Sequence, residues 1–174
     1  MSEHRADATN EYMRRTFGGL GEPSHSQLDG QLGTLMERAV AAGLPDIAVS
    51  ADVGRLLMLL AMQASRQPGA GRGVEVGALG GYSALWIARG LGPRGRLITI
   101  EPEAAHARFA RAEFERAGMA DRIELREDTG LGHLPGLLSE LGPESIDFVF
   151  LDAIKHEYLD YASVALPLDD ARVD

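Results

Sequence analysis

A glycine-rich stretch lies between a short apolar run and a helical pattern, and it reads Glu75-Val76-Gly77-Ala78-Leu79-Gly80-Gly81-Tyr82-Ser83. Glycines here let the backbone turn sharply and approach a ligand at the N-terminus of the following helix. The spacing matches neither the G-x-G-x-x-G of dinucleotide-binding proteins nor the G-x-x-x-x-G-K-[ST] of a P-loop. The stretch therefore predicts either a ligand-binding turn of another kind or an ordinary tight turn.

Two further acidic residues follow apolar runs that are typical of buried strands. Glu101 comes after 97–100, and Asp152 comes after 146–151. An acid at the first position suits hydrogen bonds to the two hydroxyls of a ribose, and it suits the N-terminus of the next helix equally well. Asp152 is likewise either a helix cap or a ligand-binding group.

Lys155 is the only lysine, since the other 16 of the 17 basic residues are arginine. Lysine can lose its proton when it is desolvated and arginine cannot, so a base or proton carrier near Asp152 could require lysine. The alternative is a surface lysine. The five histidines show no metal-ligand spacing, and only His156, next to Lys155, is expected near a site.

The elements that must position these residues are read from the apolar periodicity. We expect strands and helices to alternate from residue 73 onward, over 74–76, 82–91, 97–100, 103–117, 123–126, 131–141, 146–151 and 156–166. Four such units in series predict an α/β fold, a Rossmann-like parallel sheet with helices on both faces. Ligands of such sheets lie beyond the carboxyl ends of the strands.

The N-terminal part is expected to be helical, with helices over 11–17 and 31–42 and another that starts near Ser50 or Ala51. The 174 residues are enough for one domain. We divide it into an N-terminal helical segment, 1–45, and a core, 46–168.

Composition excludes several classes of protein. The net charge of −9 disfavours binding to nucleic acid or anionic lipid, and the absence of cysteine excludes disulfides and Cys-ligated zinc. No run of about 18 apolar residues occurs, and the polar N-terminus lacks a signal peptide. We expect a cytoplasmic protein that does not contact the membrane.

Four stretches resemble the class I S-adenosylmethionine-dependent O-methyltransferases, in the branch of the catechol and caffeoyl-CoA enzymes. They are GLPDIAVSADVGRLLMLLA, VEVGALGGYSALWIARGL, GRLITIEPEAAHARFARAEFERAGMADRIELRED and IDFVFLDAIKHEYLDYA, in unbroken order over 43–168. The family fold is a seven-stranded sheet with a Rossmann-like half. Its members are commonly dimers, which makes a homodimer an expectation here.

The resemblance also implies roles for individual residues. Those expected to bind S-adenosylmethionine are Val49, Glu75, Gly77, Ala78, Gly81, Ser83, Glu101, Thr129, Gly130 and Asp152. Asp152 matches the first aspartate that binds a divalent metal, and Lys155 matches the lysine that takes the hydroxyl proton. Asp128 replaces a glycine, and Ile154 replaces an aspartate common in the bacterial branch. The implied acceptor is a small catechol-like molecule whose hydroxyls chelate the metal.

The resemblance ends near residue 168. The family continues with a P-G-G turn, further strands and an Asp-Asn pair that completes the metal site, and residues 169–174 match none of these. We expect 169–174 to be out of frame and the chain to be truncated, with its fourth strand at an exposed apolar edge. The alternative function is then a non-catalytic remnant that binds the cofactor weakly or needs a partner chain. A nucleotide-dependent oxidoreductase is disfavoured by the missing dinucleotide fingerprint.

Overall fold

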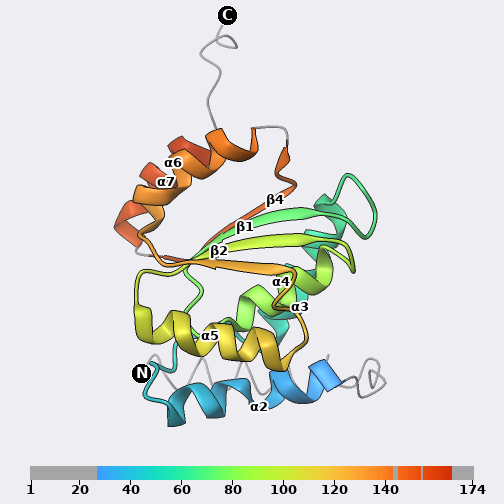
Figure 1. Cartoon of the computed structure of the whole chain (residues 1–174), viewed down its shortest axis with the longest axis vertical. Helices are drawn as coiled ribbons and strands as arrows, with labels where there is room; N and C mark the ends of the chain where they lie inside the picture. The colour runs from blue at the N-terminus through green and yellow to red at the C-terminus, as the bar shows by residue number, and fades with distance from the viewer. Residues whose placement is uncertain (1–26, 143–144, 154, 166–174) are drawn as a thin grey trace, which may run out of the picture.

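The computed structural model describes residues 27–142, 145–153 and 155–165. Within them a sheet of parallel strands forms the centre of the molecule (Figure 1). The strand order is β3-β2-β1-β4, with bounds β1 Arg72–Val76, β2 Arg96–Ile100, β3 Ile123–Arg126 and β4 Phe148–Leu151. The predicted α/β fold is confirmed. The strand order reverses at β1, because β2 and β3 lie on one side of it and β4 lies on the other.

Helices cover both faces of this sheet, as predicted (Figure 1). One face carries α2 Gln27–Ala41, α3 Ala51–Ala64, α4 Tyr82–Gly90 and α5 Ala104–Arg116. The other carries α6 Gly130–Leu141 and α7 Tyr158–Ala165, which follows a short 3₁₀ turn, η2 Lys155–Glu157. Right-handed crossovers account for this division, because the chain moves outward through β2 and β3 and then returns past β1 to β4.

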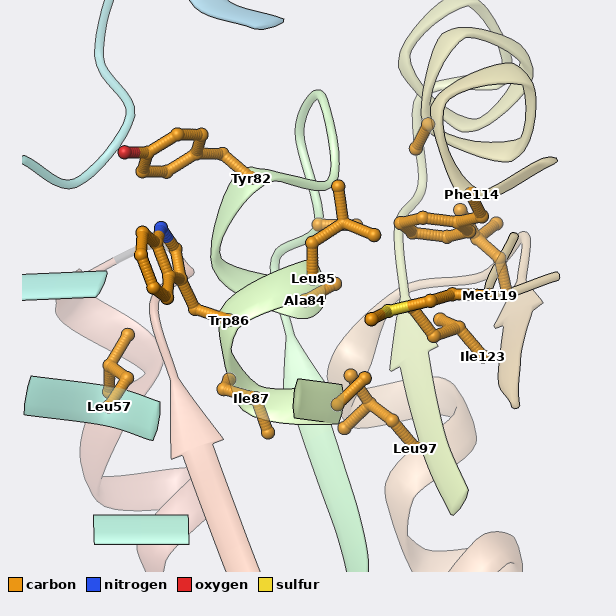
Figure 2. Close-up of a cluster of buried hydrophobic side chains, with 14 of the residues drawn as sticks. Leu57, Tyr82, Ala84, Leu85, Trp86, Ile87, Leu97, Phe114, Met119 and Ile123 are labelled. Atoms are coloured by element: carbon orange, nitrogen blue, oxygen red, sulfur yellow. The ribbon is translucent and has the colours of Figure 1, made fainter. Parts of the chain in front are cut away.

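Each layer of helices buries its own apolar cluster against the sheet. The larger cluster surrounds α4, whose side chains lie between Leu57 of α3 and Phe114 of α5 (Figure 2). Tyr82 and Trp86 of α4 pack there edge to face, with ring centroids 6.4 Å apart. The smaller cluster lies under α6 and α7 and includes Val74, Val76, Ile98, Ile100, Leu134, Leu137 and Tyr161. Strands buried on both faces explain the nearly continuous apolar runs in the sequence.

Several element boundaries differ from the sequence predictions. β4 begins at Phe148 rather than at 146, because the Asp147 carboxylate, and not a strand carbonyl, accepts the Arg72 N–H (2.9 Å) and also binds the Arg66 guanidinium (2.6 Å). The helix predicted over 156–166 is divided into η2 and α7. α2 begins at Gln27, earlier than the predicted start at residue 31. The predicted helix over 11–17 and the tail 169–174 lie outside the described residues.

β4 lies at one edge of the described sheet, as the sequence predicted, but its four apolar residues are half-buried rather than exposed. α3 likewise exposes apolar side chains, among them Leu56, Leu59, Leu60 and Met62. In the described part of the chain no helix combines the length and the apolar character needed to cross a bilayer.

Candidate functional site

A cavity of about 550 Å³ opens at the carboxyl ends of the strands, where β1 and β4 lie on either side of the reversal in strand order. Parallel sheets bind their ligands at this place. Eight of the ten residues expected at the cofactor site line the cavity together, namely Val49, Gly77, Ala78, Ser83, Glu101, Thr129, Gly130 and Asp152. These residues come from the segment before α3 and from the ends of β1, β2, β3 and β4.

The turn after β1 forms the floor of the cavity. Gly77 adopts φ +102°, and its N–H donates to Ile100 O of β2 (2.9 Å). Leu79 adopts φ +47°, a left-handed conformation that is uncommon for a residue with a side chain. Its N–H donates to a carboxylate oxygen of Glu101 (2.8 Å), so this unusual backbone conformation fixes an acid at the end of the neighbouring strand.

Glu101 is a nearly buried carboxylate held by three donors. Oε2 accepts from Leu79 N, whereas Oε1 accepts from Glu103 N (3.1 Å) and lies 3.3 Å from Nδ1 of His106. Of the two alternatives that the sequence left open for Glu101, the geometry shows the capping contact, and the ribose role stays a prediction. The side chain caps the segment that leads into α5, and it also lines the cavity.

Glu75 does not line the cavity, although it lies only two residues before Gly77. Side chains alternate along β1, so Val74 and Val76 join the cluster under α6 while Glu75 points toward α4. There it is fully buried beside Thr99, whose hydroxyl donates to Oε2 (2.6 Å), and Oε1 has no hydrogen-bond partner among the described residues. Burial raises the pKa of Glu75 to about 7, against the opposing effect of the Ser83 and Thr99 hydroxyls.

Gly81 is the other expected residue that lies away from the cavity lining. It adopts φ +82° at the N-terminus of α4, and a β-carbon there would come within 3 Å of the Phe114 ring of α5. This geometry gives Gly81 a role in the turn and in helix packing. Lys155 begins η2, four residues after the end of β4, and its side chain lies outside the described part of the chain.

The sequence reasoning missed several lining residues, among them His106, Glu157 and Tyr161. The Tyr161 hydroxyl donates to Glu157 Oε2 (2.6 Å), and burial, together with Glu157, raises the pKa of Tyr161 to about 12. The prediction that His156 is the histidine near the site is wrong, because His156 is exposed and His106 lines the cavity instead. His106 lies in the first turn of α5, which begins three residues after Glu101. This short separation from Glu101 was the signal that could have identified it.

The charge of the lining selects the kind of ligand. Glu101, Glu103, Asp152 and Glu157 contribute carboxylates, and no arginine or lysine occurs among the described lining residues. An anionic ligand such as a pyrophosphate would meet repulsion here, whereas a cationic or hydroxyl-bearing ligand would be favoured. The rest of the lining is largely apolar, as is usual for small-molecule sites.

A divalent metal does not fit the described residues. Asp152 is exposed and is the one aspartate of the cavity, and no group of three His, Cys, Asp or Glu side chains in the described ranges is arranged to hold an ion. Hard divalent cations take about six oxygen ligands.

Comparisons with known proteins agree with this geometry. The O-methyltransferase family model matches residues 23–170. Catechol O-methyltransferases of Mycobacterium tuberculosis and Niastella koreensis are 43% and 39% identical to the chain over 142 and 127 residues, which are 80% and 73% of its length. The chain spans only 60% and 55% of the length of these two relatives.

Solved structures give the same result. An O-methyltransferase from Bacillus cereus in complex with SAH superposes with a TM-score of 0.76 at 35% identity, over 92% of this chain and 67% of that one. An O-methyltransferase from Streptomyces achromogenes in complex with SAM gives 0.76 at 34% identity, over 97% and 70%. From the family match and these relatives together, the chain belongs to the O-methyltransferase family.

Proposed function

We propose that this chain binds S-adenosylmethionine and carries the cofactor half of an O-methyltransferase that acts on a hydroxyl of a small, catechol-like acceptor. The observation that carries the proposal is the cavity at the β1–β4 reversal, lined by carboxylates and by a glycine turn. A sulfonium nucleoside has a positive charge, a ribose diol and no phosphate, so it matches this lining. Relatives solved with SAH and with SAM support the same ligand.

The chain's own groups would divide the binding between them. Glu101, fixed by Leu79 N and Glu103 N, would accept the ribose hydroxyls. Gly77 would let the methionine part approach the backbone, and Thr129 and Gly130 would border the adenine. Bound S-adenosylmethionine supplies an electrophilic methyl group, and Asp152 would offer a negative charge beside it. Positioning would accelerate the reaction mainly by holding the methyl donor and the acceptor oxygen in line.

The acceptor must lose its proton to attack the methyl group. Lys155 is the proposed base, because it is the only lysine and because its backbone begins η2 at the same end of the sheet. A desolvated lysine can be neutral near pH 7, which arginine cannot.

The catechol-like acceptor and the metal assistance are the finer parts of the proposal. The catechol-like acceptor is supported by the names of the two curated relatives. Metal assistance has only the position of Asp152 at the cavity behind it. One aspartate is not a metal site, so no step of the proposed reaction passes through a metal. A homodimer is a further proposal, which sedimentation velocity tests.

The test has two stages. Calorimetric titration with SAH measures binding, and transfer of a labelled methyl group to catechol, with and without magnesium, measures activity. We expect binding in the wild-type chain, a large loss in Glu101→Ala, and no change in Glu115→Gln, which alters an exposed acid of α5 outside the cavity. Binding without transfer would favour the non-catalytic remnant, and absence of SAH binding would overturn the proposed function in favour of a remnant that needs a partner chain.

A further inference from the structure

We propose that His106 is a positioning residue for the ribose end of the cavity, an inference that rests on the proposed function. Its Nδ1–H would donate to Oε1 of Glu101 and so fix the orientation of the carboxylate for a vicinal diol. The distance between these atoms is 3.3 Å, and the His106 side chain is 23% exposed where it lines the cavity.

The geometry around Glu101 explains why a third donor matters. Leu79 N binds Oε2 and Glu103 N binds Oε1, but both amides belong to connecting segments rather than to a helix or strand. His106 is the third residue of α5, so its contact ties the carboxylate to a helix that packs against the sheet. A carboxylate offers about four acceptor positions, so Glu101 can still accept from ligand hydroxyls while these three donors hold it.

The chemistry of the pair fixes the position of the ring proton. An ionised carboxylate only accepts hydrogen bonds, so the donor must be Nδ1 of His106. In the neutral ring, Nε2 then carries no proton. His106 would therefore hold the Glu101 carboxylate through Nδ1 alone.

The other described histidines lack this arrangement. His133 lies near Arg126 and Asp128 at the start of α6, and His156 is exposed on η2. Neither lines the cavity. They provide comparison sites at which an alanine substitution removes the same ring without affecting Glu101.

Substitutions that restore only one ring nitrogen test the inference by calorimetric titration with SAH. Asparagine places its amide nitrogen near the position of Nδ1, whereas glutamine places it near that of Nε2. We expect His106→Ala and His106→Gln to weaken SAH binding by about fivefold to tenfold, the usual net value of one hydrogen bond. His106→Asn should stay within about twofold of wild type, as should His156→Ala. Thermal melts monitored by circular dichroism establish that each variant folds.

A double-mutant cycle separates positioning from direct contact. In a Glu101→Gln background, adding His106→Ala should change SAH affinity by less than about twofold, because the partner of Nδ1 has lost its charge. An undiminished effect in that background would overturn the positioning role, as would wild-type affinity in His106→Ala or failure of His106→Asn to restore binding.

A readout without ligand keeps this inference distinct from the proposed function. Long-range ¹H–¹⁵N spectra of the unliganded chain should show the Nδ1–H tautomer of His106, and the Nε2–H tautomer would overturn the inference. If the wild-type chain binds no SAH, the proposed function fails, and the role of His106 toward ribose fails with it even when the spectra show the expected tautomer. If the wild type binds and His106→Ala binds equally well, only the inference fails.

Discussion

Gly77 at the end of β1 lies against the backbone of Asp152 at the end of β4, so closely that a β-carbon on Gly77 would come within 3 Å of the Asp152 carbonyl oxygen. The strand ends are held at this distance by the hydrogen bond from Asp152 N to Val76 O (2.9 Å). Together with φ +102°, the contact requires glycine at this point. The end of β1 and the end of β4 therefore meet at Gly77, where there is no room for a side chain.

Gly77→Ala should destabilise the fold and abolish SAH binding. The backbone clash and the positive φ together should cost at least about 2 kcal/mol of unfolding free energy, measured by urea denaturation. Gly43→Ala is a matched control, because Gly43 has φ +86° but nothing within 4 Å of its β-carbon position, so only the φ term of about 1 kcal/mol applies. Equal losses at the two positions would contradict the contact with Asp152.

The order of the elements was predictable from the sequence because each strand is a short apolar run followed by a periodic helix. The convergence of Glu101, Asp152 and the glycine turn followed from the same reasoning, since parallel strands end at one edge of the sheet. The position of Glu75 was not foreseen, although alternation along β1 from the buried Val74 and Val76 determines it.

Other features depend on contacts that no local pattern contains. The start of β4 is set by the side chain of Asp147, which binds Arg66 about 80 residues earlier in the chain. Which histidine lies at the site depends on the contact of α5 with Glu101, and that contact brings in His106. Adjacency to Lys155 in the sequence indicated His156 instead. Tyr161 and Glu157 reach the cavity only because the chain folds back after β4, so that α7 lies beside α6 and β4.

The buried carboxyl of Glu75 should make stability depend on pH. Its pKa is about 7 in the folded chain against a usual value of 4.5, so the folded state holds this proton more tightly than the unfolded state does. Stability should therefore fall as the pH rises from about 4.5 to about 7, by roughly 3 kcal/mol at most, and level off above that. Glu75→Gln removes the charge and should abolish this fall in urea denaturation series, whereas Glu115→Gln, on the surface of α5, should preserve it.

The ion pair between α2 and α5 should contribute measurably to stability. Glu113 is 3% exposed and accepts from Arg38 through both carboxylate oxygens, with Nε at 3.1 Å from Oε1 and Nη2 bound to Oε2. Glu113→Ala leaves the partly buried Arg38 without this partner and should cost about 1–3 kcal/mol. Glu127→Ala, in the exposed pair with Arg111, should cost less than about 1 kcal/mol. Similar losses in chemical denaturation would argue against burial as the cause.

Lys155 should be needed for turnover and not for cofactor binding. Methionine keeps most of the length of the side chain but cannot accept a proton, and arginine keeps the charge but cannot release one at neutral pH. In a preparation that transfers methyl groups to catechol, Lys155→Met and Lys155→Arg should each lower kcat at least about 100-fold, the lower range for a general base. SAH affinity from calorimetry should stay within about twofold of wild type. A variant that keeps its kcat would remove Lys155 from the reaction, and a parallel loss of SAH affinity would make it part of the binding site instead.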